Sequence, residues 1–234
     1  MNFSMIVLAI VPARGGSKSI PIKNIKKLSG EPLISYTINI ALKSKKINKL
    51  IVSTDSEKIA RISKSLGAEV PFLRPKRISI DSSNTIDLVK HTIKKLEKYN
   101  FYPDIITVLQ PTSPFRKLWM IDKSINMLIK SNSTSVISVL KIKKHPYQSF
   151  WFKGKYLKPF KNDFLKFYQR QLFPELFYPT GAIYTFWTST LKKYDSLYGP
   201  RIKPLIIDND IINLDIDDSF DFFTAEMCKK YQKN

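Results

Sequence analysis

Cysteine and histidine are scarce in this sequence, which has one cysteine, Cys228, and two histidines among 234 residues. A single cysteine cannot form an internal disulfide, and Cys228 has no neighbouring residues at a spacing that would bind zinc. Because disulfides are rare in reducing compartments, this composition suits such a compartment. We therefore expect a cytoplasmic protein.

Long apolar runs are also missing, since none approaches the roughly 20 residues that a helix needs to cross a bilayer. We expect no membrane partner. The apolar opening MNFSMIVLAIVPARGG has no basic residue before its apolar run and continues into a cationic loop. It therefore predicts a first buried strand and not a signal peptide.

Acidic residues are few: 19 Asp and Glu stand against 39 Lys and Arg, which gives a formal net charge of +20. An excess of this size attracts polyanions such as nucleic acid. The lysines are scattered, however, as in KSKKINK and IKKLEK, and no known nucleic-acid-binding motif accompanies them. We favour a solvated, lysine-rich surface with no specific nucleic-acid partner.

Apolar runs alternate with helical periods over the first 140 residues. The runs that read as strands are MIVLAIV, KLIVSTD, AEVPFL, DIITVLQP and TSVISVLKI, and amphipathic stretches between them read as helices. Near the end, GAIYTFW reads as a strand, and IINLDIDDSFDFFTAEMCKKY as a short strand, an acidic turn and a helix. The alternation predicts a single α/β domain over residues 1–234, with a mostly parallel sheet and helices on both faces.

The alternation stops near residue 141, and residues 141–179 are rich in aromatics and prolines without a clear period. A long irregular segment in a compact domain is usually functional or part of an interface. Its aromatic side chains would be exposed in a monomer: Phe150, Trp151, Phe152, Phe160 and Phe164. We interpret the segment as an arm that forms a homodimer. The alternative is a platform on which the bases of single-stranded nucleic acid stack.

A cationic loop with two glycines, VPARGGSKSIPIKN, follows the first strand at residues 11–24. Ligands of open α/β sheets bind at the carboxyl ends of the strands, so this loop is in position to hold phosphates. Gly15 and Gly16 let the backbone approach an anion closely. Donors and positive charge come from Arg14, Ser17, Lys18 and Lys23. The spacing matches neither the dinucleotide-binding motif nor the P-loop, so it leaves the phosphate compound unnamed.

Two carboxylates, Asp215 and Asp217, stand two residues apart near the end of the chain. In an extended segment both would lie on one side, with Leu214 and Ile216 on the other. Two such carboxylates repel unless a cation lies between them, and Mg²⁺ binds oxygen ligands together with substrate phosphates. The alternative is an acidic helix start at which Asp217 and its neighbours cap the last helix. The cationic loop favours the metal site.

Six stretches taken together resemble the acylneuraminate cytidylyltransferase family, also called CMP-sialic acid synthetases. They occur in the family's order and span nearly the whole chain: AIVPARGGSKSIPIKN, IVSTDS, FLRP, LQPTSPFR, PTGAIY and LDID. The resemblance implies a Rossmann-like nucleotidyltransferase domain with an inserted dimerisation arm. It also implies an enzyme that joins CTP to a nine-carbon 2-keto sugar acid, uses Mg²⁺ and releases pyrophosphate.

The same resemblance assigns site residues position by position. Contacts to the phosphates, with a catalytic role for the cations, fall on Arg14, Ser17, Lys18 and Lys23. Contacts to the nucleotide fall on Asn24, on Arg74 at the cytosine and on Thr85. Gln110 and Tyr184 match the sugar-acid pocket, Arg170 matches an arginine of the arm region, and Asp215 and Asp217 match the metal ligands. For Arg74 the alternative is an ion pair with Asp81, and for Gln110 a polar loop start.

The implied reaction is an attack of the sugar's anomeric hydroxyl on the α-phosphorus of CTP. Catalysis of this kind relies on positioning and charge neutralisation more than on a covalent nucleophile. The base is either Asp217 or a metal-bound water, and the sequence leaves both open. His91 lies in an expected helix and His145 precedes a proline, so we interpret both as structural.

One departure from the family pattern concerns the sugar. Many sialic acid enzymes of the family have an arginine before PNGAIY, where this chain has Tyr178 before PTGAIY. The exact sugar therefore stays open between sialic and legionaminic acid types. The alternatives are cytidylyltransferases for pseudaminic or 3-deoxy-octulosonic acid, and an inactive, basic homologue that binds nucleic acid.

Overall fold

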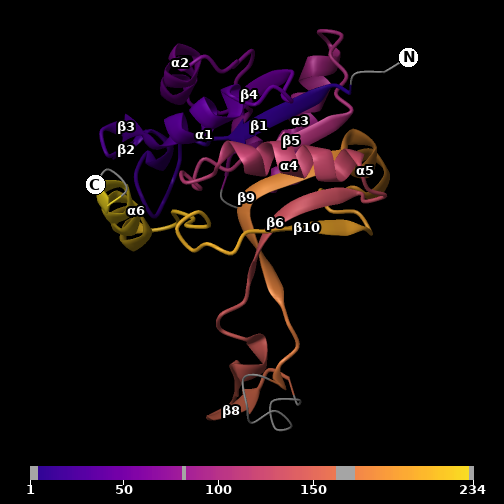
Figure 1. Ribbon diagram of the computed structural model, residues 1–234. Helices are drawn as coiled ribbons and strands as arrows, with labels where there is room; N and C mark the ends of the chain where they lie inside the picture. Colours follow the sequence, from indigo (N-terminus) through magenta and orange to yellow (C-terminus); the bar gives the residue numbers. More distant parts are fainter. Residues whose placement is uncertain (1–4, 81–82, 162–171, 232–234) are drawn as a thin grey trace.

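The centre of the molecule is a six-stranded sheet with the strand order β10-β6-β9-β5-β1-β4 (Figure 1). The computed structural model describes residues 5–80, 83–161 and 172–231. The strands are β1 (Val7–Pro12), β4 (Lys49–Ser53), β5 (Ile105–Val108), β6 (Ser135–Lys141), β9 (Phe177–Trp187) and β10 (Ile202–Ile206). β9 runs antiparallel to β5 and β6, while the other neighbouring strands are parallel. The predicted mostly parallel α/β sheet is therefore confirmed.

Helices cover both faces of this sheet, as the alternation predicted. They are α1 (Leu33–Leu42), α2 (Glu57–Ser65), α3 (Thr85–Glu97), α4 (Leu118–Ile129) and α5 (Thr188–Tyr194), while α6 (Ser219–Tyr231) packs apart from these faces. Successive residues of a strand point to opposite faces. Accordingly Val7, Ala9 and Val11 of β1 pack with α1, α2 and α4, while Leu8 and Ile10 pack with α3 and α5. Within the described ranges, no helix is both long and apolar enough to cross a membrane.

The C-terminal helix α6 packs beside the first part of the chain. Phe222 and Ala225 of α6 and the preceding Ile216 form a small core cluster with Leu28 and Leu33. Leu28 belongs to β2 (Lys27–Leu28), which pairs with β3 (Glu31–Pro32). This packing fixes the acidic segment before α6 next to the loop that follows β1.

Three short segments differ from the sequence-based expectations. AEVPFL forms only a single bridge, Ile51 to Glu69, because Pro71 interrupts it. The expected strand in IINLD is a turn, in which the Asn209 side chain accepts the N–H of Ile212. β10 was not expected. Four of its five residues are exposed, and the fifth, Leu205, is buried. An edge strand can hold a proline and exposed residues, so its apolar pattern is weak.

The described residues 142–161 and 172–179 extend away from the body of the molecule, below β6 and β9 in Figure 1. Although the sequence has no clear period here, the segment contains a hairpin of β7 (Phe150–Lys153) and β8 (Tyr156–Pro159). A short 3-10 turn, Pro146–Gln148, precedes it. β9 begins at Phe177, four residues before the expected GAIYTFW, because it pairs with β6 out to Lys141. Phe164 and Arg170 lie outside the described residues.

Candidate active site

A cleft of about 430 Å³ opens at the carboxyl ends of β1 and β5. It brings together predicted residues from distant parts of the chain: Arg14, Ser17, Lys18, Lys23, Asn24, Arg74, Thr85, Gln110 and Asp217. It is also lined by residues that the sequence did not single out, among them Ser19, Ser79, Ser83 and Thr112. The loop after β1 therefore faces a real cleft, as its position predicted.

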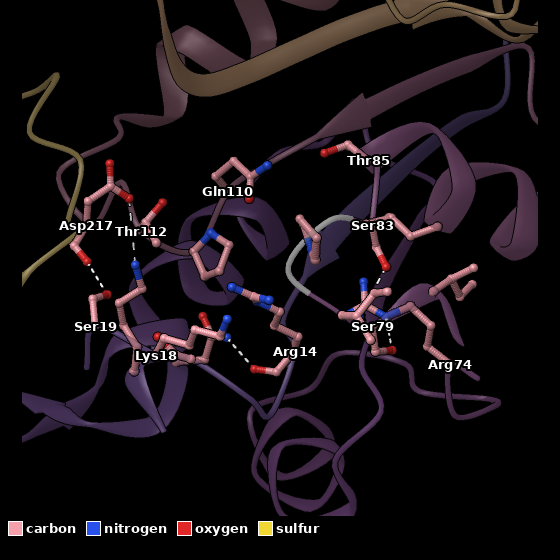
Figure 2. A pocket seen from close by; sticks show the side chains of 18 residues that line it. Arg14, Lys18, Ser19, Arg74, Ser79, Ser83, Thr85, Gln110, Thr112 and Asp217 are labelled. Atoms are coloured by element: carbon pink, nitrogen blue, oxygen red, sulfur yellow. Dashed lines mark hydrogen bonds and ion pairs between the residues drawn. The ribbon is translucent and has the colours of Figure 1, made fainter. Parts of the chain in front are cut away.

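The two ends of this cleft differ in chemistry. Figure 2 shows Lys18, Ser19 and Asp217 toward one end and Arg74, Ser79 and Ser83 toward the other, with Arg14 between them. The first end carries the cations and the carboxylate. The second end is formed by hydroxyls, a guanidinium and the apolar side chains of Ile78, Ile80 and Leu88. An anionic group suits the first end, and a flat polar ring suits the second.

The cationic loop is held by contacts from its neighbours. The N–H of Gly15 donates to Oδ1 of Asp55 at 2.9 Å, and the N–H of Ala13 donates to the Ser53 carbonyl at 2.9 Å. The side chain of Asn24, which is 5% exposed, donates to the Arg14 carbonyl at 2.9 Å. Asn24 thus lines the cleft and also fixes the backbone that carries Arg14.

Arg74 is a buried cation in the wall of the cleft, with 6% of its surface exposed. Its Nε donates to Oγ of Ser79 at 3.0 Å, and its Nη2 lies 4.0 Å from Oδ1 of Asp55. Burial lowers the pKa of Arg74, and the nearby charge of Arg14 adds to this, while Asp55 opposes it. The alternative partner Asp81 lies outside the described residues. The guanidinium is thereby oriented by Ser79 and Asp55 at the second end of the cleft.

Lys23 joins the cationic loop to the acidic segment before α6. Its Nζ donates to the Ile216 carbonyl at 2.7 Å and lies 3.8 Å from Oδ1 of Asp217. Ser19 donates its hydroxyl to the Asp217 carbonyl. The cap of α6 is supplied by Asp218, whose Oδ1 accepts the N–H groups of Phe220 and Asp221. The Asp217 carboxylate is therefore not needed as a cap and faces the cleft.

Asp215 is largely buried beside Asp217, and burial raises the pKa of its carboxyl group. The Asp217 charge adds to this effect, while a hydrogen bond from Thr112 and the charges of Lys23 and Arg116 oppose it. Its Oδ1 is buried and accepts no hydrogen bond from any residue that the structure describes. Ile216 between the two carboxylates points into the core and is 0% exposed, as the alternation predicted.

The carboxylate pair fits a hard cation. An uncompensated, buried carboxylate oxygen is costly, and a cation beside it would relieve that cost. Mg²⁺ takes one or two carboxylates and completes its shell with water and substrate phosphates. In the part of the chain that the structure describes, no group of three or more acidic, histidine or cysteine side chains could hold a metal by itself. A site at Asp215 and Asp217 would therefore need oxygen ligands from a bound substrate.

A second cleft, of about 530 Å³, lies on the other side of the carboxylate pair. Asp217 lines both clefts, and Asp215 lines the second. The other lining residues include Leu140, Tyr178, Thr180, Gly181, Tyr184, Asp210 and Asn213. Burial raises the pKa of Tyr184 to about 12, with smaller contributions from Tyr198 and Asp215. Gln110 and Tyr184, which were expected in one pocket, thus line two clefts that share Asp217.

Two further predicted roles can be compared with the structure. His145 is buried outside the clefts, where its Nδ1 accepts the N–H of Tyr147 and its Nε2 lies 3.0 Å from the Pro174 carbonyl. His91 lies in α3 and lines neither cleft. Both placements agree with a structural interpretation. Arg170 lies outside the described residues, so its role stays a prediction.

Comparisons with known proteins point to one family. Residues 8–203 match a family model described as "Cytidylyltransferase". A CMP-N,N'-diacetyllegionaminic acid synthase of Legionella pneumophila is 34% identical over 224 residues, which cover 95% of each chain. An N-acylneuraminate cytidylyltransferase of Escherichia coli is 34% identical over 233 residues, 97% of this chain and 54% of that protein.

The fold also matches a solved structure. A CMP:2-keto-3-deoxy-manno-octonic acid synthetase complexed with CTP superposes with a TM-score of 0.73. The match covers 97% of this chain and 99% of the other, at 14% sequence identity. At this identity the likeness concerns the fold alone.

Proposed function

The chain belongs to the cytidylyltransferase family, and from this premise we propose that it joins CTP to a nine-carbon 2-keto sugar acid. The observation that carries the proposal is the position of the carboxylate pair. Asp217 lines a cleft with Arg14, Lys18 and Lys23 on one side and a second cleft with Tyr184 on the other. Two substrates held in these clefts would meet at the carboxylates.

In the proposed reaction, the anomeric hydroxyl oxygen at C2 of the sugar acid forms a bond to the α-phosphorus of CTP. The bond from that phosphorus to the oxygen bridging to the β-phosphate breaks, pyrophosphate leaves with the electron pair, and the hydroxyl proton passes to Asp217 or to water. Negative charge grows on the phosphoryl oxygens and on the leaving group. Arg14, Lys18 and Lys23 would stabilise this charge at the cationic end of the cleft.

We propose that Asp215 and Asp217 hold Mg²⁺ when CTP is bound. The cation would supply Lewis-acid stabilisation of the phosphates. Asp217 faces the cleft beside Lys23, and Asp215 has a buried oxygen that accepts no hydrogen bond within the described ranges. Lys23 contacts the Ile216 carbonyl between the two carboxylates, so it would hold the segment in place as well as contact phosphate.

The base of the nucleotide would lie at the opposite end of the first cleft. Ser79, Ser83 and Thr85 offer hydroxyls there, and Arg74 is oriented by Ser79 and Asp55. These groups can recognise the exocyclic amine and the carbonyl of cytosine through hydrogen bonds. Ser17 and Asn24 would support the sugar and phosphates of the nucleotide from the loop after β1.

The second cleft is the proposed sugar-acid site. Leu140, Tyr178 and Tyr184 give it apolar surface that suits N-acyl groups, and Thr180 offers a hydroxyl. Tyr178 stands where many sialic acid enzymes have arginine, and its ring extends the apolar surface. This favours a sugar acid with more than one acylamino group, as in diacetyllegionaminic acid, over N-acetylneuraminic acid.

Two further properties belong to this proposal. We propose that the arm at residues 141–179 forms a homodimer, because Trp151, Phe152 and Tyr156 are 60%, 78% and 78% exposed in one chain. We also propose a cytoplasmic location, because the single cysteine Cys228 suits a reducing compartment.

A pyrophosphate-release assay tests the function. Purified protein is incubated with CTP and Mg²⁺ and with one of four acids: N-acetylneuraminic, N,N′-diacetyllegionaminic, pseudaminic or 3-deoxy-octulosonic acid. We expect release to depend on CTP, on added divalent cation and on a nine-carbon acid, fastest with the legionaminic acid. No release with any of the four acids would refute the proposal, and release with only the eight-carbon acid would refute the sugar class.

A further inference from the structure

The most unusual buried group outside the assigned residues is the guanidinium of Arg116, at the end of the LQPTSPFR stretch. Arg116 is 3% exposed. Among the residues that the structure describes, no carboxylate lies within 4.0 Å of it, and Asp215 is the acidic group whose charge acts on it. Burial lowers the pKa of Arg116 to about 9. A buried cation without a close counter-charge is costly, so its position calls for a compensating role.

Three of the five N–H groups of the guanidinium donate to three different parts of the chain. Its Nε donates to the Ala182 carbonyl at 2.9 Å, and its Nη2 donates to the Gln110 carbonyl at 2.6 Å. Its Nη1 donates to Oγ1 of Thr37 on α1 at 2.9 Å. The planar fork of an arginine can hold three acceptors at fixed angles, which a lysine cannot do.

The two carbonyls occupy a special place in the sheet. The register of β5 and β9 ends with Val108 opposite Tyr184, and continuing it would place Gln110 opposite Ala182. At this point the two strands part. β9 changes register against β6 in the same region, between Ile137 and Val139, and Ser138 accepts the Ile183 N–H there. Arg116 therefore donates to two facing carbonyls that lie just beyond the last paired residues of β5 and β9.

The point where β5 and β9 part lies between the two clefts. Gln110 lines the first cleft. Gly181, next to Ala182, lines the second cleft, and a Cβ on it would lie 3.4 Å from Oδ2 of Asp215. The positions of the Gln110 and Ala182 backbones thus set how the clefts face each other.

We propose that Arg116 is a positioning residue that fixes the separation of β5 and β9 and so aligns the sugar-acid cleft with the nucleotide cleft. The inference rests on the proposed function. Among the described residues that line the nucleotide cleft, Arg116 donates only to Gln110, while Arg74 is oriented by Ser79 and Asp55. Loss of the guanidinium should therefore disturb use of the sugar acid much more than binding of CTP.

The experiment compares Arg116→Lys with wild type and with Arg61→Lys, the same change at an exposed arginine of α2. CTP affinity is measured by calorimetry, and kcat/KM is measured for N,N′-diacetyllegionaminic acid and N-acetylneuraminic acid at saturating CTP. For Arg116→Lys we expect the dissociation constant of CTP to change less than about twofold, while kcat/KM for the acid falls at least about tenfold, because small misalignment of reactants is costly. Arg61→Lys should match wild type in both.

A second variant covers the case in which Arg116→Lys does not fold. Thr37→Val removes one of the three acceptors at nearly constant volume, together with the 3.4 Å bond from the Thr37 hydroxyl to the Gln110 carbonyl. Thr92→Val is its control, since among the described residues the Thr92 hydroxyl donates only to Leu88 in its own helix. Thr37→Val should lower kcat/KM for the acid at least about threefold without weakening CTP binding. Equal losses in CTP binding and acid use, or no loss in either, would overturn the inference. Wild-type protein that binds CTP but turns over neither acid would overturn the proposed function, and the inference with it.

Discussion

Gly15 donates its backbone N–H to the carboxylate of Asp55 at 2.9 Å, which ties the cationic loop after β1 to the end of β4. The same Asp55 oxygen lies 4.0 Å from the Arg74 guanidinium. One carboxylate thus supports both the phosphate end and the base end of the first cleft. Because Gly15 makes this contact, we expect Gly15 and Gly16 to differ in how well they accept a side chain.

The first prediction concerns those glycines. A Cβ on Gly15 would lie 3.0 Å from Cβ of Ser56, while a Cβ on Gly16 would meet no described atom within 4 Å. Because the Ser56 backbone is fixed at the start of α2, Gly15→Ala should lower the free energy of unfolding by about 1–3 kcal/mol. Gly16→Ala should leave it unchanged or raise it by up to about 1 kcal/mol. Urea unfolding of both variants checks this, and equal effects would contradict it.

The second prediction concerns charge at the cationic end of the first cleft. Lys18→Ala and Asp217→Asn should each lower turnover by at least about a hundredfold, because each removes a preorganised charge from the proposed reaction centre. Both side chains line the cleft, so the fold should stay intact. Turnover is measured by pyrophosphate release and folding by thermal unfolding. Lys27→Ala and Asp208→Asn remove exposed charges elsewhere and serve as controls. Near-normal turnover of either cleft variant would remove that residue from its role.

The third prediction concerns the choice of nucleotide. If Arg74, Ser79 and Ser83 recognise cytosine, CTP should be strongly preferred over UTP and ATP, because an unpaired buried polar group is costly. Arg74→Lys keeps the charge but loses the Nε donor to Ser79. It should lower the ratio of kcat/KM for CTP over UTP, while Arg77→Lys, at an exposed position, should keep the wild-type ratio. Equal rates of the wild-type protein with CTP and UTP would refute this assignment.

Much of the fold could be predicted because its signal is local. The strands β1, β4, β5 and β6 are continuous apolar runs, and their alternation with amphipathic helices determines a parallel sheet. β10 and the β7–β8 hairpin escaped prediction because their side chains are mostly exposed, so burial leaves no pattern in the sequence. The early start of β9 depends on pairing with β6, a contact between residues far apart in the chain.

The site could be predicted where chemistry and position coincide. Arg14 and Lys18 follow a strand directly, and Asp215 and Asp217 form a pair, so their residue types alone suggested a role. Arg116 offered no such signal, because its function depends on two carbonyls that meet only in the folded sheet. The division of Gln110 and Tyr184 between two clefts likewise depends on where β5 and β9 part.

The fourth prediction concerns the dependence of stability on pH. Both ring nitrogens of His91 are buried, and neither forms a hydrogen bond with a residue in the described part of the chain. Burial lowers the pKa of His91, and the charges of Lys95, Arg74 and Arg77 lower it further. The unfolded chain therefore binds the proton more tightly than the folded protein. The free energy of unfolding should keep its full value above the unfolded pKa of about 6.5 and should decrease as the pH falls below it.

Replacement of this histidine tests the sign. His91→Leu removes the titrating group and keeps an apolar contact beside Phe72. The free energy of unfolding in urea is measured at several pH values between about 7.5 and 5, and the variant should lose less stability than wild type over this range. An identical slope in wild type and His91→Leu would contradict the prediction.

The fifth prediction concerns the arm. In one chain, the hairpin β7–β8 pairs Trp151 with Lys158 and Phe152 with Leu157, and all of its residues but Pro159 are exposed. A two-stranded hairpin is at best marginally stable alone, so its aromatic side chains need a cover. A second copy in a closed two-fold pair is the commonest way to provide one. We therefore expect light scattering of the wild-type protein to give the mass of a dimer at micromolar concentration.

Trp151→Glu combined with Phe152→Glu should lower the mass toward a monomer and reduce turnover, because Arg170 of the arm is expected near a neighbouring site. Trp119→Glu, at a tryptophan of α4 that is 46% exposed, should change neither mass nor turnover. A wild-type monomer would instead favour the stacking of nucleic-acid bases on these rings, which salt-sensitive binding of a single-stranded oligonucleotide would reveal.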